Sequence, residues 1–315
     1  MKVDVVASLP HYLDHLRPIF DALPDELQGQ VYGGSTPWSL RPRGVPRLTL
    51  VAGWQDVRDG NGSMVYVEHG AGQSYAGDPK TAHQPGYSAS GGARHRGVVG
   101  YIAPSEEVAR RWRSGTGRPA VAVGCPKLDA YLIDDPPVPE ERTICLAWHW
   151  DCLISPEARS AWNHYAERLP RVVAAWHRQG WRVFGHSHPR WEGALDSTML
   201  TAGVDEILAT DRQVFERAAV LAVDNSSIGM EFQALDRPVI WLDAPWYRRN
   251  ISHGGRFWDW VIGAPRVSGP DELIELKLNN VWTWGYREYA GRAYDHLDGL
   301  SALRAADFVT ALATG

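Results

Sequence analysis

The segment at residues 220–243, VLAVDNSSIGMEFQALDRPVIWLD, constrains the fold of this chain more than any other. An apolar run from Val220 to Val223 ends in a polar turn, and a helix-compatible segment follows. Arg237-Pro238 ends that segment because proline cannot continue a helix, and a second apolar run begins at Val239. The pattern predicts two buried parallel strands joined by a helix.

The polar turn, Asp224-Asn225-Ser226-Ser227, lies where a strand passes into a helix N-terminus. The first amides of a helix have no intrahelical acceptors, and the helix dipole adds partial positive charge. The turn is therefore a candidate site for a diphosphate, with two adjacent hydroxyls and with Gly229 allowing close approach. The alternative is that Asn225 and Ser226 serve only as an N-cap.

The rest of the chain repeats this alternation of strands and helices on both sides of the segment DDPPVPEE, residues 134–141, which predicts an interdomain linker. We expect an α/β protein with two doubly wound domains, at residues 1–135 and 136–315. Ligands of such sheets bind at the carboxyl ends of the strands, and with two domains the cleft between them is the natural site. Strands are expected near residues 3–9, 48–51, 64–67, 98–102, 121–123, 143–147, 181–185 and 204–208, and helices near 11–23, 105–113, 157–179 and 211–219.

Composition excludes several classes of protein. The chain is 44% hydrophobic and 22% charged with a formal net charge of −5, which is unlike a dedicated nucleic-acid binder. No stretch approaches the roughly 18–20 apolar residues of a membrane helix, and the N-terminus lacks a signal-peptide pattern. Cys125, Cys145 and Cys152 are not spaced as paired ligands. We expect a cytoplasmic protein with reduced thiols.

Glu68-His69-Gly70-Ala71-Gly72 directly follows the expected strand at residues 64–67. The glycines let a substrate approach the backbone, and a histidine at that strand end can accept a proton from a hydroxyl group. Glu68 is a candidate to orient or charge-stabilise His69. The alternative is a histidine that is only hydrogen-bonded in a loop.

Gly185-His186-Ser187-His188-Pro189-Arg190 follows another expected strand. Two histidines and an arginine at one strand end suggest contact with a phosphate, Arg190 or a protonated His188 being the charged donor. A metal site is the competing interpretation. His186 and His188 alternate along an extended backbone, so their side chains should point apart, which favours phosphate.

Two further polar segments are weaker signals. Gly124-Cys125-Pro126-Lys127-Leu128-Asp129 forms a turn after the strand at residues 121–123. The basic and aromatic segment at residues 247–260, YRRNISHGGRFWDW, could hold an acceptor or a nucleotide or could be a packed loop.

The order of these motifs resembles the CDP-glycerol glycerophosphotransferase family. The motifs that carry the resemblance are EHGAG, GCPKLD, GHSHPR, VDNSSIGMEF, RPVIWLD, RRNISHGGRFWDW and DGLSALRAADFV, scattered over residues 60–310. The resemblance implies a GT-B fold, similar to that of UDP-GlcNAc 2-epimerases, with two Rossmann-like domains, a deep cleft between them and a last helix that crosses back to the N-terminal domain.

The resemblance also implies roles for residues. The family's general base falls on His69, next to Gly70, and its histidine-proline motif near the donor diphosphate falls on His188 and Pro189. Its aspartate-x-serine-serine turn falls on Asp224, Ser226 and Ser227, which would bind the donor phosphates. An acid on the following helix, Glu231, would hold the donor ribose.

These expectations combine into one reaction. A nucleoside-diphosphate donor lies in the C-terminal domain, and His69 deprotonates an acceptor hydroxyl on a glycan, a polyol phosphate or a modified DNA base. The donor is a substrate, and no cofactor or metal is expected. Three alternatives stay open: a UDP-sugar 2-epimerase, a phage-type glycosyltransferase acting on a hydroxylated DNA base, and a non-catalytic nucleotide-binding protein. For the DNA reading, the loop SASGGARHR at residues 88–96 with Arg41 and Arg43 could form a basic patch.

Overall fold

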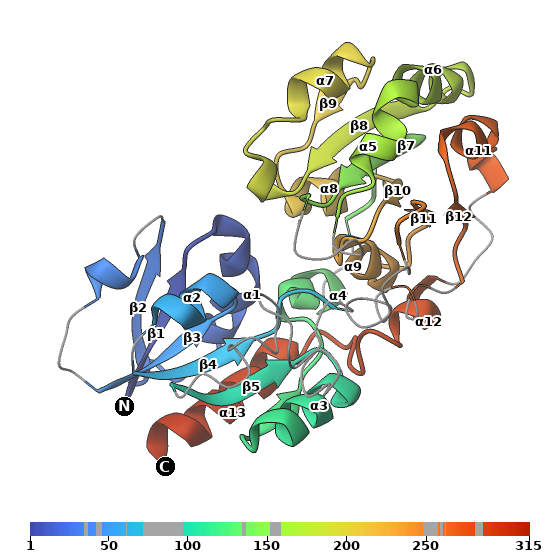
Figure 1. The fold of residues 1–315 in the computed structure, drawn as a ribbon. Helices are drawn as coiled ribbons and strands as arrows, with labels where there is room; N and C mark the ends of the chain where they lie inside the picture. Colours follow the sequence, from blue (N-terminus) through green and yellow to red (C-terminus); the bar gives the residue numbers. More distant parts are fainter. Residues whose placement is uncertain are drawn as a thin grey trace. The chain divides into compact units, whose positions relative to one another are not determined.

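The chain folds into two compact α/β units (Figure 1). The first unit contains Met1–Asp134 and Gly291–Gly315, and the second contains Asp135–Ala290. Each unit is built on one six-stranded sheet. The computed structural model describes residues 1–34, 37–41, 46–60, 62–71, 97–133, 137–151, 159–247, 258, 261, 263–280 and 286–315.

The first unit has a parallel sheet in the order β2-β1-β3-β4-β5-β6. Because β1 lies between β2 and β3, the chain changes direction across the sheet there, and the carboxyl ends of β1 and β3 mark the switch point. Its strands are β1 (Lys2–Ala7), β2 (Gln28–Gly33), β3 (Arg47–Val51), β4 (Ser63–Val67), β5 (Val98–Ala103) and β6 (Ala120–Ala122). Its helices are α1 (Pro10–Asp21), α2 (Trp54–Asp59), α3 (Glu106–Thr116), α4 (Asp129–Ile133) and α13 (Ser301–Thr314), with 3₁₀ turns at Pro37–Leu40 and Pro126–Leu128.

The C-terminal helix α13 packs on the core of the first unit. Apolar residues of α1 and α13 share one buried cluster with strands of this sheet. Asp129 holds the start of the helix, since its carboxylate accepts hydrogen bonds from the amides of Ser301 and Ala302 at 3.1 and 2.6 Å. The GCPKLD turn is therefore a docking point for the returning chain, which explains why its aspartate is buried.

The second unit has a parallel sheet in the order β12-β11-β10-β7-β8-β9. The switch point lies between β7 and β10, which pair along Val220–Val223. Its strands are β7 (Thr143–Trp148), β8 (Arg182–Ser187), β9 (Glu206–Ile207), β10 (Val220–Val223), β11 (Val239–Leu242) and β12 (Arg266–Val267). Its helices are α5 (Trp162–Tyr165), α6 (Leu169–Arg178), α7 (Asp196–Thr201), α8 (Asp211–Arg217), α9 (Ile228–Ala234), α11 (Pro270–Glu275) and α12 (Tyr286–Ala290), with 3₁₀ turns at Ala166–Arg168, Pro189–Trp191 and Leu278–Asn280.

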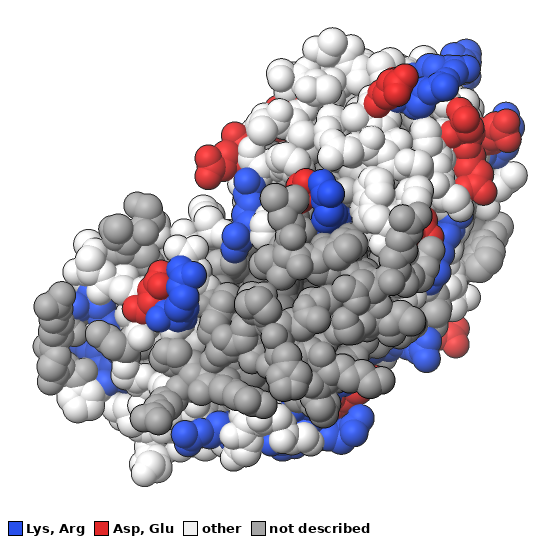
Figure 2. All heavy atoms as spheres, in the orientation of Figure 1, with Lys and Arg blue, Asp and Glu red and all other residues white. Residues whose placement is uncertain are grey.

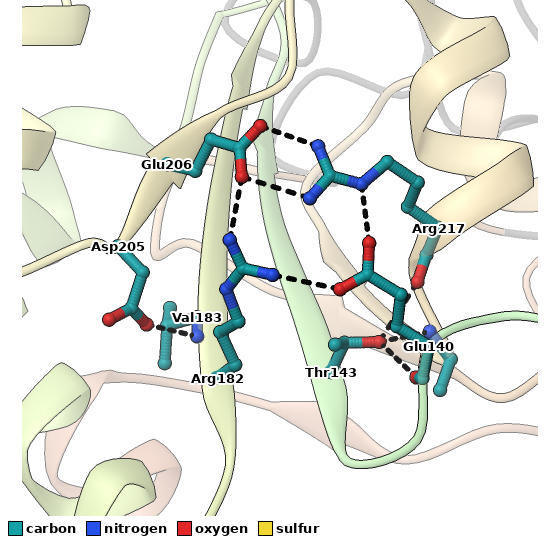
Figure 3. A network of polar contacts seen from close by, with 8 residues as sticks. Glu140, Thr143, Arg182, Val183, Asp205, Glu206 and Arg217 are labelled. Carbon is teal, nitrogen blue, oxygen red and sulfur yellow. Dashed lines mark hydrogen bonds and ion pairs between the residues drawn. The ribbon is translucent and has the colours of Figure 1, made fainter.

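A network of charged side chains ties the amino ends of the strands together in the second unit (Figure 3). Arg182 bridges Glu140 and Glu206 at 2.8 and 2.7 Å, and Arg217 bridges the same two carboxylates. Hydrogen bonding to Arg217 lowers the pKa of Glu206. The acid Glu140 of the expected linker is thus bonded into the sheet. Because ligands of parallel sheets bind at the opposite, carboxyl ends, this network is structural.

Two observed strands, β2 and β12, were not expected from the sequence. β2 has the sequence QGQVYG, and it lies at the edge of its sheet, where polar residues are tolerated. β12 is only two residues long. Among the helices that the structure describes, none has the length and apolar character needed to span a membrane.

Candidate functional site

The expected strand, turn and helix are present at residues 220–234. β10 ends at Val223, the turn Asp224–Ser227 follows, and α9 begins at Ile228 with Ser227 as its N-cap residue. The turn therefore lies at the carboxyl end of a central strand, beside the switch point of the sheet. α9 contains only seven residues, so the local amides matter more here than the dipole of a long helix.

Asp224 has a different role from the expected phosphate contact. It is completely buried, and its carboxylate accepts hydrogen bonds from the His149 amide at 2.8 Å, the Ser160 hydroxyl at 3.0 Å and the Ala161 amide at 2.9 Å. These bonds join the turn after β10 to the end of β7 and to the segment before α5. Asp224 therefore holds the walls of the site rather than facing a ligand, because a buried carboxylate would repel a diphosphate.

Asp224 makes folding stability depend on pH. Burial raises the pKa of this carboxyl to about 6, although its three hydrogen bonds act in the opposite direction. A raised pKa in the folded state favours the native state at low pH, and the advantage is lost as the pH rises through 6. Between pH 4 and 7 we expect the unfolding free energy of the wild type to fall relative to Asp224→Asn by on the order of 3 kcal/mol. Denaturant titrations of both proteins at several pH values measure this difference. Parallel pH dependences would contradict it.

Three successive backbone amides at the start of α9 have no acceptor among the residues that the structure describes. Within the described residues, no hydrogen bond is donated by the backbone of Ser226, Ser227 or Ile228. Ser226 and Ser227 are also half-buried, at the boundary between the core and the surface. Consecutive amides without acceptors, beside two hydroxyls, form a concave site suited to an anion. This is the part of the turn that is available to a phosphate.

Gly229 provides packing space rather than access for a ligand, which corrects the expectation from the sequence. A Cβ at this position would lie 2.3 Å from the Trp241 ring and 2.8 Å from Val223. The glycine therefore lets α9 approach β10 and β11 closely. Asn225 and Glu231 are buried at 2% and 1% exposure. Glu231 lies one helical turn after Ser227.

The end of β8 places His188 and Arg190 at the same edge of the sheet. The His188 amide donates to the Trp148 carbonyl oxygen, and its Nδ1 accepts from the Arg190 amide at 3.1 Å. Nδ1 therefore has a backbone partner, and the expectation that Arg190 or a protonated His188 is the charged donor stays a prediction. Arg190 is exposed and lies over the Trp150 ring at 4.7 Å from its centroid.

His149 and Trp150 belong to this site, although the sequence did not suggest them. They follow β7, and the rings of His149 and His188 lie 5.3 Å apart. The sequence contains a sign of His149, because it is a histidine directly after a buried strand. The same feature identified His69 and His188.

His186 and His188 do not form a pair of metal ligands. His186 is buried, with Nδ1 2.8 Å from the Leu208 carbonyl oxygen and Nε2 3.1 Å from Asp211. Both of its nitrogens have protein partners, as the alternation along β8 predicts. No group of three His, Cys, Asp or Glu side chains within the described ranges is arranged to hold a metal ion.

A hollow of about 220 Å³ opens beside His188 at the carboxyl ends of β8 and β9. Ser187 and Asp196 supply its polar side chains, and Leu208 and Ala209 form the wall after β9. It therefore adjoins the group of residues already described and belongs to the same edge of the sheet.

In the first unit His69 lies after β4, at the carboxyl edge of its sheet, with the buried Gly70 next to it. Its ring meets the ring of Tyr12 edge-on, with 4.7 Å between centroids. His11 and His15, also on α1, each have a ring centroid 6.2 Å from that of His69. The sequence did not indicate this cluster, because its members come from segments more than fifty residues apart.

Glu68 is bonded to another partner than the one expected. Its Oε2 accepts a hydrogen bond from the Trp112 indole of α3 at 2.8 Å. This contact gives Glu68 a structural partner on α3. The expected role of Glu68 beside His69 stays a prediction.

The structure weakens the DNA interpretation at Arg41. Its side chain is 8% exposed and pairs with the buried Asp4 at 3.1 Å. On the face seen in Figure 2, several coloured basic side chains lie next to acidic ones rather than in one continuous basic area. Arg43, the loop at residues 88–96 and most of the segment at residues 247–260 lie outside the described residues.

No protein-family model matches this chain, and no curated protein matches its sequence. Solved structures do match over nearly its whole length. A variant of the wall teichoic acid polymerase TagF is 12% identical with a TM-score of 0.65, over 98% of this chain and 88% of the other. The UDP-GlcNAc 2-epimerase of Methanocaldococcus jannaschii, in complex with UDP-GlcNAc and UDP, is 13% identical with a TM-score of 0.56, over 99% of this chain and 100% of the other.

A Listeria monocytogenes protein described as a candidate UDP-N-acetylglucosamine 2-epimerase also matches. It is 12% identical with a TM-score of 0.56, over 99% of this chain and 97% of the other. At such identities the likeness establishes the fold. The expected GT-B fold, with two Rossmann-like units, is thereby confirmed, and its resemblance to the teichoic acid enzymes and the epimerases holds at the level of structure.

Proposed function

We propose that this chain is a GT-B transferase that moves a glycosyl or glycerophosphoryl group from a nucleoside-diphosphate donor to an acceptor hydroxyl. The observation that carries the proposal is the run of amides at Ser226, Ser227 and Ile228, which lack backbone acceptors in the described structure at the switch point of a Rossmann-like sheet. Such a position suits the diphosphate of a nucleotide donor.

Charged and polar groups beside this turn suit the leaving group. His188 supplies an imidazole N–H, and Arg190 supplies a guanidinium held over Trp150. Donors fixed before the reaction stabilise charge as it develops on the leaving phosphate oxygen. In the proposal Asp224 keeps these walls in place, Asn225 completes the turn, and Glu231 hydrogen-bonds the donor ribose.

His69 is proposed as the general base of the first unit. It accepts the proton of the acceptor hydroxyl while the acceptor oxygen bonds to the transferred group. In glycosyl transfer the bond from the anomeric carbon to the β-phosphate breaks, and the nucleoside diphosphate leaves with the electron pair. In glycerophosphoryl transfer the bond between the β-phosphorus and the bridging oxygen breaks, and the nucleoside monophosphate leaves. The proton stays on His69 until solvent takes it.

The structural neighbours support this class of donor. One epimerase was solved with UDP-GlcNAc and UDP, and a TagF variant was soaked with CDPG. The acceptor is proposed to be a hydroxyl of a glycan or a polyol phosphate. A cytoplasmic location accompanies the proposal, and the buried thiol of Cys145 is in keeping with it.

A UDP-sugar 2-epimerase is the second candidate. It is favoured by one observation, the match to known epimerase structures over 97–100% of their own chains. An epimerase needs the nucleotide site proposed here but no acceptor, so the two activities can be separated by experiment.

Binding of the donor should raise thermal stability. Saturation at about 100 times Kd stabilises the native state by about 2.7 kcal/mol. We expect UDP-GlcNAc or CDP-glycerol to raise the unfolding temperature by several degrees, and the shift should persist in EDTA because the proposed anion site consists of amides, hydroxyls and a guanidinium. A shift that EDTA abolishes and divalent metal restores would show that a metal carries the diphosphate.

A further inference from the structure

We infer that Tyr12 is the positioning residue of His69 and that Gly53 exists to make room for Tyr12. The inference rests on the proposed function, because it concerns the residue proposed there as the base. The first observation is contact: the Tyr12 and His69 rings meet edge-on at an interplanar angle of 67° with 4.7 Å between centroids. Tyr12 is only 2% exposed, so its own ring is fixed by packing.

The second observation is the shape of the backbone under the Tyr12 ring. Gly53 precedes α2, after β3, with φ −84° and ψ 138°. This is an ordinary extended conformation that any residue adopts, so the glycine is not needed for its backbone freedom. A Cβ there would instead lie 2.4 Å from Tyr12 Cε2 and 2.8 Å from Asp56 Oδ2. The missing side chain therefore provides the space that the tyrosine ring occupies.

The third observation is the place of this group in the sheet. α1 begins after β1, and Gly53 follows β3, so the two segments meet at the switch point of the first unit. Asp56 ties them together, since its two carboxylate oxygens both lie 3.2 Å from the Ser8 amide. The ring of Tyr12 is thus held between Gly53 on one strand end and His69 on another. His11 and His15, on the same helix, flank the imidazole at 6.2 Å.

An imidazole that abstracts a proton must keep its nitrogen aimed at the acceptor oxygen. A displacement of about 1 Å can cost roughly 100-fold in rate even when the chemistry is unchanged. A rigid aromatic ring against His69 supplies that restraint through packing. Tyr12 therefore fixes the orientation of the His69 imidazole. Replacing Tyr12 should not change the affinity for the donor.

The test compares Tyr12→Phe, Tyr12→Leu and Gly53→Ala in the full chain. Tyr12→Phe keeps the ring and should retain kcat within a few-fold. Tyr12→Leu and Gly53→Ala should each lower kcat by roughly 10–100-fold with little change in the KM of the donor. Gly33→Ala is the matched control, because its Cβ would meet nothing closer than 3.8 Å.

A double variant separates the specific contact from general disruption. Once residue 12 is leucine, the added methyl group has no tyrosine ring to displace and meets only Asp56 Oδ2, so the loss in the double variant should be smaller than the product of the two single losses. Losses that multiply in full, or a Tyr12→Phe as impaired as Tyr12→Leu, would overturn the inference.

A second measurement does not depend on activity. In protein labelled at histidine, the NMR signals of the His69 ring, identified by their loss in His69→Gln, should move in Tyr12→Leu and in Gly53→Ala but not in Gly33→Ala. If the His69 signals did not move in these variants, the contact between Tyr12 and His69 would be refuted, even if the protein were shown to be a transferase. If His69→Gln kept full activity, the proposed base would be wrong, while the NMR shifts would still report the contact.

Discussion

Replacing His69 with alanine should lower turnover by about 10²–10⁴-fold, the contribution of general base catalysis, and change donor affinity by no more than about threefold. Turnover should fall while donor affinity changes little, because His69 belongs to the first unit and the proposed donor site belongs to the second. The wild-type rate should rise with pH through one ionisation in the neutral range, as an imidazole base requires. Steady-state kinetics with calorimetric titration of the donor measure both quantities.

The control for this experiment is His177→Ala. His177 is a surface histidine of α6 that bonds to Asp205 at 2.9 Å, and its loss should leave turnover unchanged. If His69→Ala instead lost donor binding and kept its turnover at saturation, His69 would be a donor ligand and not the base.

Replacing Ser226 and Ser227 together with alanine should weaken donor binding by about 1–3 kcal/mol, the range for lost hydrogen bonds to a charged group. That is roughly 5–150-fold in Kd. Some affinity should remain, because the substitution leaves the amides of residues 226–228 in place. Calorimetric titration of the folded variant gives the change, with Ser114→Ala, an exposed serine of α3, as the control. If the double variant bound the donor with unchanged affinity, the two hydroxyls would not be part of the donor site.

The sequence predicted well those features of the site that depend only on neighbouring residues in the chain. The strand, turn and helix at residues 220–234 follow from an apolar run, a polar turn and a helical segment that are contiguous in the chain. The same holds for His69 and His188, each of which directly follows a buried strand. Parallel sheets collect such positions at one edge, so the rule needs no knowledge of distant contacts.

The errors concern contacts between residues far apart in the chain. Asp224 was expected to touch phosphate, but its acceptor capacity is used by His149, Ser160 and Ala161. The hydrogen bond from the Trp112 indole to Glu68 was likewise not expected. Neither partner could be chosen from sequence spacing, because both depend on which helix packs on which strand.

Glycine was a second source of error. The sequence suggests ligand approach at Gly229 and no role for Gly53, yet both glycines make room for an aromatic ring. The ring is that of Trp241 in one case and of Tyr12 in the other. The sequence does not distinguish a glycine that allows a ligand to approach from one that allows an aromatic ring to pack. Only the position of the missing Cβ distinguishes them.

The most direct test of the account follows the phosphorus of the donor by ³¹P NMR. Wild-type protein is incubated with UDP-GlcNAc or with CDP-glycerol, each alone and with glycerol 3-phosphate and a panel of glycans as acceptors. The account predicts release of UDP or of CMP that requires an acceptor and is lost in His69→Ala. Conversion of UDP-GlcNAc to its 2-epimer without any acceptor, at the same rate in the variant, would contradict it.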